Sequence, residues 1–107
     1  MPVRSTRRRY LWIHVETEAS LNAETLDASI ESKIHFLYGV NGAVDINYRL
    51  IELIDGNDAV IRCNHTRLNQ MRTALAHISE IQGKPARIDV KLVSGTIKAL
   101  KKKISLR

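Results

Sequence analysis

The sequence is poor in the residues that cross-link, anchor or interrupt a chain. It holds a single cysteine, Cys63, which excludes an internal disulfide, and no linker, internal repeat or low-complexity segment divides its 107 residues. No stretch approaches the roughly 20 consecutive apolar residues of a membrane helix, and no apolar run follows the basic start as a signal peptide requires. We therefore expect one cytoplasmic domain over residues 1–107, long enough to fold around its own core.

Acidic residues are absent from both ends of the chain. Residues 1–10 hold four arginines and residues 91–107 hold six basic residues without any Asp or Glu, whereas residues 11–90 hold seven basic and eleven acidic residues. Clustered positive charge favours a polyanion-binding surface, because each neutralised phosphate releases counterions. Basic ends that only improve solubility are the alternative. We expect a flexible basic arm over 1–8 and a basic helix and tail over 96–107.

Aromatic residues are also scarce, at 5% of the chain. Tyr10, Trp12 and Tyr48 would offer a base-stacking surface if they shared an open sheet face, as in RNA-recognition domains. The predicted strand 59–63 contributes no aromatic residue, however, and the glycine- and aromatic-rich motif of those domains is missing. The favoured alternative is that Tyr10 and Trp12 pack under the third predicted helix or serve as anchors of a protein interface.

Strands are predicted where apolar residues alternate with polar ones. This pattern covers residues 10–15, 44–50, 59–63 and 86–92. The second and third of these segments flank a turn at residues 55–58 and form a predicted hairpin. The apolar phase slips near Ile51, which indicates a bulge or burial on both sides.

Helices are predicted where apolar residues recur at intervals of three and four. The first begins after a cap at Ser20 or Asn22 and ends at Gly39, and the second runs from near Thr66 through Ile81. The third begins after a cap at Ser94 or Thr96 and carries its lysines on the solvated side. The order βαββαβα predicts an α+β, ferredoxin-like sandwich with a four-stranded antiparallel sheet, two helices on one face and an extra C-terminal helix.

A small motif between the last strand and the last helix is the main local candidate for anion binding. The backbone N–H groups of Ser94, Gly95 and Thr96 precede a lysine-rich helix and can meet a phosphate there. A plain capping turn is the alternative, and in both cases Gly95 supplies either a positive φ or a close approach. The full set of RNA-binding candidates is Arg7, Arg8, Arg9, Lys91, Ser94, Gly95, Thr96, Lys98, Lys101, Lys102 and Lys103.

Neither a metal site nor an active site is expected in the chain. Cys63 and His65 have the spacing of a metal-ligand pair, but there is no second cysteine to complete a zinc site. Cys63 ends an apolar strand, where a buried inert thiol is the usual occupant. Because no paired carboxylates or acid–base pair stand out, we predict no catalytic residue.

Several short motifs nevertheless resemble those of one family in the same order along the chain. They are Arg8-Arg9-Tyr10-Leu11, Tyr38-Gly39, Ile61-Arg62-Cys63, Ala74-Leu75 and the most specific, Val93-Ser94-Gly95-Thr96-Ile97-Lys98. The chain resembles the archaeal ribonuclease P protein component 2 family, whose eukaryotic relatives are named Pop-five and Rpp-fourteen. Ala59 departs from this pattern, since a glycine often precedes the Ile-Arg-Cys strand.

The resemblance implies a protein subunit of ribonuclease P, the ribonucleoprotein that removes the 5′ leader from precursor tRNA. In that family the RNA subunit holds the Mg²⁺ ions and performs the hydrolysis, so no cofactor is expected on the protein itself. The protein pairs with ribonuclease P protein component 3, in a heterotetramer with two copies of each, and helps the RNA to adopt its active conformation.

Two other classes of protein share the predicted topology. An acylphosphatase-like enzyme needs an arginine in a phosphate-cradling loop after the first strand, where this chain has Glu16-Thr17-Glu18 and would repel the substrate. A small-molecule-binding regulatory domain has no need of basic clusters at both ends. Of these three functions, only RNA binding predicts that the affinity for structured RNA falls steeply as the salt concentration rises.

Overall fold

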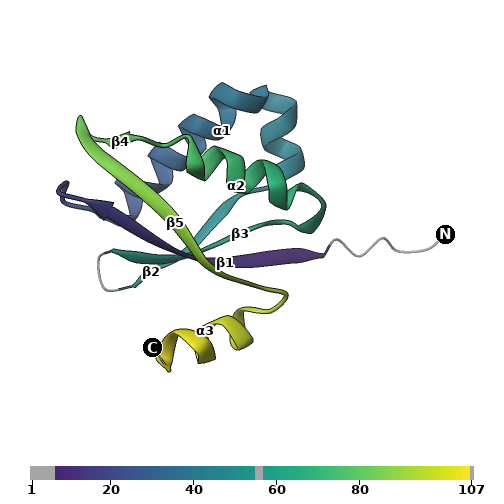
Figure 1. The fold of residues 1–107 in the computed structure, drawn as a ribbon. Coiled ribbons are helices and arrows are strands. Elements are labelled where there is room, and N and C mark those ends of the chain that lie inside the picture. Colours follow the sequence, from purple (N-terminus) through teal and green to yellow (C-terminus); the bar gives the residue numbers. More distant parts are fainter. Residues whose placement is uncertain (1–6, 55–56, 107) are drawn as a thin grey trace.

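A computed structural model describes residues 7–54 and 57–106 of the chain, arranged as a sheet with helices on both faces (Figure 1). In chain order the elements are β1 (Arg8–Thr17), α1 (Ala23–Ile46), β2 (Arg49–Ile54), β3 (Asp58–Asn64), a 3₁₀ turn (His65–Arg67), α2 (Leu68–Ala76), β4 (Glu80–Ile81), β5 (Lys84–Ser94) and α3 (Ile97–Ser105). The predicted α+β order of long elements is confirmed. The predicted four-stranded sheet is wrong by one strand, because the short β4 joins it.

The sheet is antiparallel, with β1 at its centre and the strand order β2-β3-β1-β5-β4. Tyr10, near the start of β1, lies opposite Ser94 at the end of β5 and opposite Arg62 of β3. The two ends of the chain that carry the basic residues therefore meet at one edge of the sheet, as the predicted topology requires.

Two apolar cores lie on opposite faces of the sheet. Helices α1 and α2 cover one face, and α3 covers the other (Figure 1). Under α1 and α2 the strands contribute the buried residues Leu11, Ile13, Val15, Ala59, Ile61, Cys63 and Ile88, with Val90 partly buried beside them. The prediction that the first two helices cover the same face of the sheet is confirmed.

The first helix does not end at Gly39, as predicted. Gly39 has φ 72° and ψ −173°, a kink that only glycine adopts easily, and the helix resumes beyond it to Ile46. Val44 and Ile46, predicted to begin the second strand, are helical, and that strand starts at Arg49. The helix starts at Asn22, whose side-chain Oδ1 accepts a hydrogen bond from the Thr25 N–H at 2.8 Å.

The second helix is shorter than predicted and ends at Ala76. Ile78 and Ile81 continue the apolar spacing, but both are buried outside the helix, and Ile81 belongs to β4. Gln82 and Gly83 have φ 53° and 78°. Positive φ at both central residues is the geometry of a tight hairpin, so Gly83 turns β4 into β5 rather than ending a helix.

Bulges interrupt the register at two places. The pairing of β2 with β3 shifts between Leu50 and Glu52, which confirms the irregularity predicted near Ile51. The pairing of β1 with β5 shifts between Trp12 and Ile13, opposite Leu92 and Val90, so that Lys91 is the extra residue. The outer edge of β5 is paired with β4 at only Lys84 and Pro85 within the described part of the chain.

Candidate nucleic-acid interface

The basic start of β1 and the Ser94–Thr96 turn lie side by side. The Arg9 Nη1 atom is 3.1 Å from the position that a Cβ on Gly95 would occupy. Gly95 is not among the glycines with positive φ, so the sequence alternative that it permits a close approach is the one observed. The basic start of β1 is thus in contact with the turn that precedes the lysine-rich α3.

The turn itself has the hydrogen bonds of a helix cap. The Ser94 hydroxyl accepts from the Thr96 N–H at 3.3 Å, and the Thr96 hydroxyl accepts from the Ala99 N–H at 3.2 Å. Of the two predicted caps, Thr96 is therefore the cap of α3. Because these two amides are satisfied within the turn, an anion here would depend on the remaining amides, the helix dipole and the neighbouring cations.

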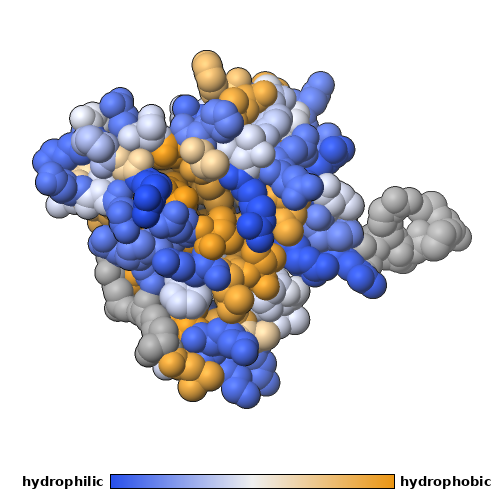
Figure 2. Space-filling view, viewed as in Figure 1, coloured by the Kyte–Doolittle hydropathy of each residue, from blue (hydrophilic) through white to orange (hydrophobic). Residues whose placement is uncertain are grey.

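Helix α3 packs its apolar side against the sheet and exposes lysine side chains on its outer side. Leu100 and Ile104 are buried against Val60 of the sheet, which fixes the rotation of the helix. Lys98, Lys102 and Lys103 are exposed on its outer side. In the space-filling view, hydrophilic residues lie beside the start of β1, and hydrophilic and hydrophobic residues lie together over α3 (Figure 2).

Lys101 differs from the other lysines of α3. Its Nζ lies 2.6 Å from Glu52 Oε1 on β2. This ion pair ties the helix to the sheet, so Lys101 is less available to RNA than the sequence predicted. Lys91 is exposed at the bulge of β5.

The basic arm predicted for residues 1–8 lies mostly outside the described residues. At its inner end, the Arg7 carbonyl accepts a hydrogen bond from the His65 N–H at 3.1 Å, and Arg8 is the first residue of β1. Arg7 and Arg8 are thus anchored to the end of β3, and both are exposed.

The aromatic residues do not form an open stacking surface. Tyr10 and Trp12 are half-buried and pack against the core under α3, as the favoured alternative predicted. Trp12 Nε1 donates to Asp58 Oδ2 at 2.9 Å, and His14 Nδ1 lies 2.6 Å from Asp58 Oδ1. Tyr48 is buried on the opposite face, in the core under α1. The possibility that Tyr10, Trp12 and Tyr48 share one open face for base stacking is therefore wrong.

The pair Cys63 and His65 is split between the core and the edge of the sheet. Cys63 is fully buried in the core under α1 and α2, and burial raises the pKa of its thiol to about 11. His65 is held at the edge by the Arg7 carbonyl, 3.2 Å from its Nδ1. A thiol that stays protonated at neutral pH is neither a nucleophile nor a ready metal ligand.

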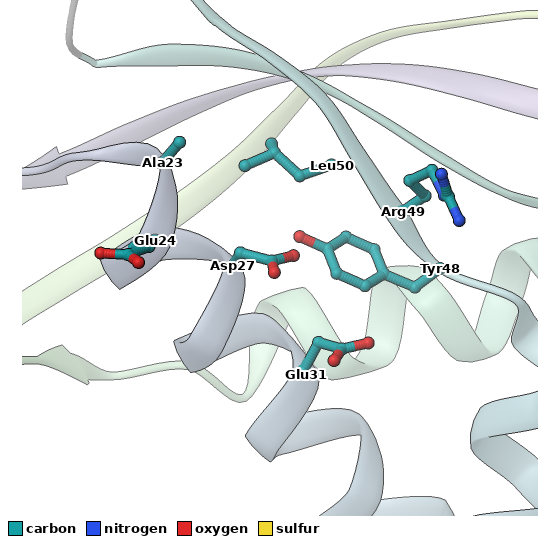
Figure 3. A pocket seen from close by; sticks show the side chains of 7 residues that line it. All are labelled: Ala23, Glu24, Asp27, Glu31, Tyr48, Arg49 and Leu50. Atoms are coloured by element: carbon teal, nitrogen blue, oxygen red, sulfur yellow. The ribbon is translucent and has the colours of Figure 1, made fainter.

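The acidic part of the protein gathers around a pocket between α1 and β2 (Figure 3). Glu24, Asp27 and Glu31 line it from α1, and the buried Tyr48 lines it from β2's side. Its volume is about 450 Å³. Burial, followed by the nearby Asp27 and Glu31 carboxylates, raises the pKa of Tyr48. These carboxylates repel phosphate, so RNA is expected on other surfaces.

Two arginines on the sheet were missed by the sequence analysis. Arg49 and Arg62 lie directly opposite each other on β2 and β3, and Arg62 is also opposite Tyr10. Both fall in the acidic middle of the sequence, where local charge gives no indication of a basic surface. Only the strand register places them beside the arginines of β1.

Known proteins resemble this chain in sequence over nearly its whole length. Residues 9–105 match the model of the Rpp14/Pop5 family. The ribonuclease P protein component 2 of Methanosarcina mazei is 30% identical over 98 residues, which cover 92% of this chain and 84% of that protein. Its counterpart in Methanosarcina acetivorans is also 30% identical, over 92% of this chain and 74% of that protein.

A solved structure shares the fold at lower sequence similarity. One chain in the cryo-EM structure of yeast ribonuclease MRP superposes with a TM-score of 0.72 at 14% identity, over 98% of this chain and 94% of that one. The domain is thus an α+β module with a basic edge and a lysine-rich third helix. The chain belongs to the Rpp14/Pop5 family. No helix in the described part of the chain is long and apolar enough to cross a membrane.

Proposed function

We propose that the chain is an RNA-binding protein subunit of ribonuclease P and assists the catalytic RNA in removing the 5′ leader from precursor tRNA. Its family membership and the names of its relatives support this assignment. The holoenzyme is a tRNA-maturing endoribonuclease, and the contribution of this chain is to the conformation of the RNA.

The observation that carries the proposal is the convergence of the two basic ends. Arg9 lies against Gly95, and Tyr10 is paired with Ser94. Helix α3, which carries the exposed Lys98, Lys102 and Lys103, begins directly after the turn that contains Gly95. This is a fixed array of cations at one edge of a domain whose acidic pocket lies between α1 and β2.

Such an array acts on RNA by reducing electrostatic repulsion. RNA helices that pack closely bring phosphates together, and basic side chains held in place offset this repulsion at a lower concentration of divalent ions. Leu100 and Ile104 hold the backbone of α3 against the sheet, so its lysines project from fixed positions. They position one RNA segment relative to the protein, whereas Mg²⁺ bound by the RNA subunit supplies the chemistry of phosphodiester hydrolysis.

The proposal extends to the partners and the compartment. We assign ribonuclease P RNA and ribonuclease P protein component 3 as the binding partners, in an assembly with two copies of each protein, and the cytoplasm as the place of action. Precursor tRNA is contacted through the holoenzyme. The partners, their stoichiometry and the compartment are assigned from the family resemblance. The hydrolysis is assigned to the RNA because the sequence contains no acid–base pair suited to nuclease chemistry.

Reconstitution tests the proposed function. Cleavage of a precursor tRNA by the ribonuclease P RNA and the other protein subunits is measured over a Mg²⁺ series, with and without this chain. We expect the chain to lower the Mg²⁺ concentration needed for half-maximal cleavage and to have no nuclease activity alone. An unchanged Mg²⁺ dependence, or metal-dependent cleavage by the highly purified chain that survives controls for contamination, contradicts the proposal.

A further inference from the structure

A row of arginines crosses the sheet on the face that carries α3. Arg62 alternates with the core residues Ile61 and Cys63, so its side chain projects toward the α3 side, like that of Val60. Arg49 is directly opposite Arg62 and shares its face. Arg8 is opposite Asn64, two residues further along β3, which makes it a diagonal neighbour of Arg62.

Cross-strand geometry brings these charges within reach of one ligand. Directly opposite residues have Cβ atoms about 4.5–5.5 Å apart, and diagonal neighbours about 7–8 Å. Like charges directly opposite each other destabilise a sheet unless something neutralises them. The Arg49–Arg62 pair therefore carries a modest free-energy cost, which an anion placed between the two guanidinium groups would reduce.

No carboxylate of the described residues forms an ion pair with this row of Arg8, Arg49 and Arg62. Glu52, on the same strand as Arg49, is engaged by Lys101 at 2.6 Å. Arg49 also lines the pocket of Asp27 and Glu31, but its guanidinium is directed away from these carboxylates and forms no ion pair with them (Figure 3).

Arg62 is also held in place before any ligand arrives. Its side chain is half-buried, and its Nε atom is buried without a hydrogen-bond partner. Burying an arginine stem fixes the guanidinium and lowers the entropy lost when it binds an anion. A buried N–H without a partner carries a free-energy cost that no hydrogen bond within the described residues offsets at Arg62.

We propose that Arg8, Arg62 and Arg49 form a second RNA-binding site, in which the sheet face beside α3 holds the phosphates of an RNA strand that crosses β1, β3 and β2. The ligand is the phosphodiester backbone, because guanidinium groups form bidentate hydrogen bonds with phosphate. Contacts to phosphate position an RNA strand but do not read its base sequence. The inference rests on the proposed function and extends its surface from the α3 edge across the sheet.

The test is a salt titration of RNA binding by single variants of the full chain. The probe is the ribonuclease P RNA, and the slope of log affinity against log salt reports the number of phosphates neutralised. Arg49→Gln removes one contact, and we expect a slope shallower by about 0.7–0.9 and binding weaker by roughly five- to tenfold near 0.1 M salt. Arg49→Glu is expected to weaken binding further while stabilising the fold, because the introduced carboxylate would lie opposite the Arg62 guanidinium.

The matched control is Arg72→Glu, the same change of charge at an exposed arginine of α2 on the opposite face. We expect it to leave the slope nearly unchanged. Arg62→Lys keeps the charge but loses the bidentate geometry, so it is expected to weaken binding several-fold without changing the slope. Thermal unfolding of each variant confirms that the fold is retained.

The outcomes separate this inference from the proposed function. If the wild-type chain binds with a steep slope, and Arg49→Gln, Arg49→Glu and Arg72→Glu affect it equally, the second site is overturned while RNA binding stands. If the wild-type chain shows no salt-dependent binding, the proposed function fails first. A reduced slope only for the Arg49 variants supports the second site.

Discussion

The Arg9 guanidinium lies against Gly95, with its Nη1 3.1 Å from where a side chain on Gly95 would begin. Gly95→Ala is expected to change the free energy of unfolding by less than about 0.5 kcal/mol, because only the flexible end of Arg9 has to move. It is also expected to weaken RNA binding by displacing that guanidinium. Chemical denaturation and RNA titration measure the two effects separately.

The control for that prediction is a double-mutant cycle. In an Arg9→Gln background the alanine at position 95 displaces nothing, so the two substitutions are expected to be non-additive in RNA affinity. Additive losses contradict a role for Arg9 at this contact.

Replacing Leu75 tests the helix packing. Leu75 of α2 is 1% exposed and belongs to the core under α1 and α2. Leu75→Ala is expected to lower the free energy of unfolding by about 2–5 kcal/mol. Leu106→Ala makes the same chemical change at a leucine that is 73% exposed, and less than about 0.5 kcal/mol is expected there. Similar losses at both positions, measured by denaturant unfolding, contradict the assignment of the core.

Weakening the packing of α3 against the sheet tests whether the position of its lysines matters, because the number of charges stays the same. Leu100→Ala removes a fully buried contact with Val60 but no charge. We expect faster amide hydrogen exchange over residues 97–105 and weaker stimulation of precursor tRNA cleavage at saturating protein. Unchanged stimulation, despite faster exchange, indicates that the lysines do not need a fixed position.

Charge reversal on α3 tests the lysines themselves. Lys98→Glu with Lys102→Glu is expected to reduce cleavage stimulation even at saturating protein and to make the salt slope shallower by about two. The control, Lys84→Glu with Arg72→Glu, makes the same total change at exposed residues elsewhere on the protein. Removal of residues 1–8 is expected to raise the protein concentration required and to make the salt slope shallower without abolishing the maximum. If the α3 variant and the truncated chain both keep the wild-type salt slope and stimulation, the basic ends serve solubility only.

The buried thiol predicts a pH dependence of stability. Burial raises the pKa of Cys63 from 9.0 to about 11, so between these values the unfolded chain releases a proton that the folded chain keeps. Stability is therefore expected to fall as the pH rises from 9 toward 11, and this slope is expected to be smaller in Cys63→Ala. Denaturant unfolding at a series of pH values measures the difference between the two proteins. Equal slopes contradict the raised pKa.

Local patterns in the sequence predicted the order of the long elements and the single face that α1 and α2 cover. They failed where local geometry departs from the periodic pattern. The sequence predicts that Gly39 ends the first helix and that apolar spacing continues the second through Ile78 and Ile81. The kink and the tight hairpin that are found there depend on backbone angles that these patterns do not encode. The pairing of Arg49 with Arg62 depends on the bulge in β2, so the sequence could not place those charges together.

The bulge at Lys91 has a consequence for how copies of the protein meet one another. It lies in β5, whose outer edge is paired with β4 only at Lys84 and Pro85 in the described residues. A straight edge of that length would be a template for strand addition and fibre growth. The bulge bends the strand and breaks its row of N–H and C=O groups, and Arg87, Asp89 and Lys91 add charge along it. The open side of the sheet is thereby protected from self-assembly without being covered.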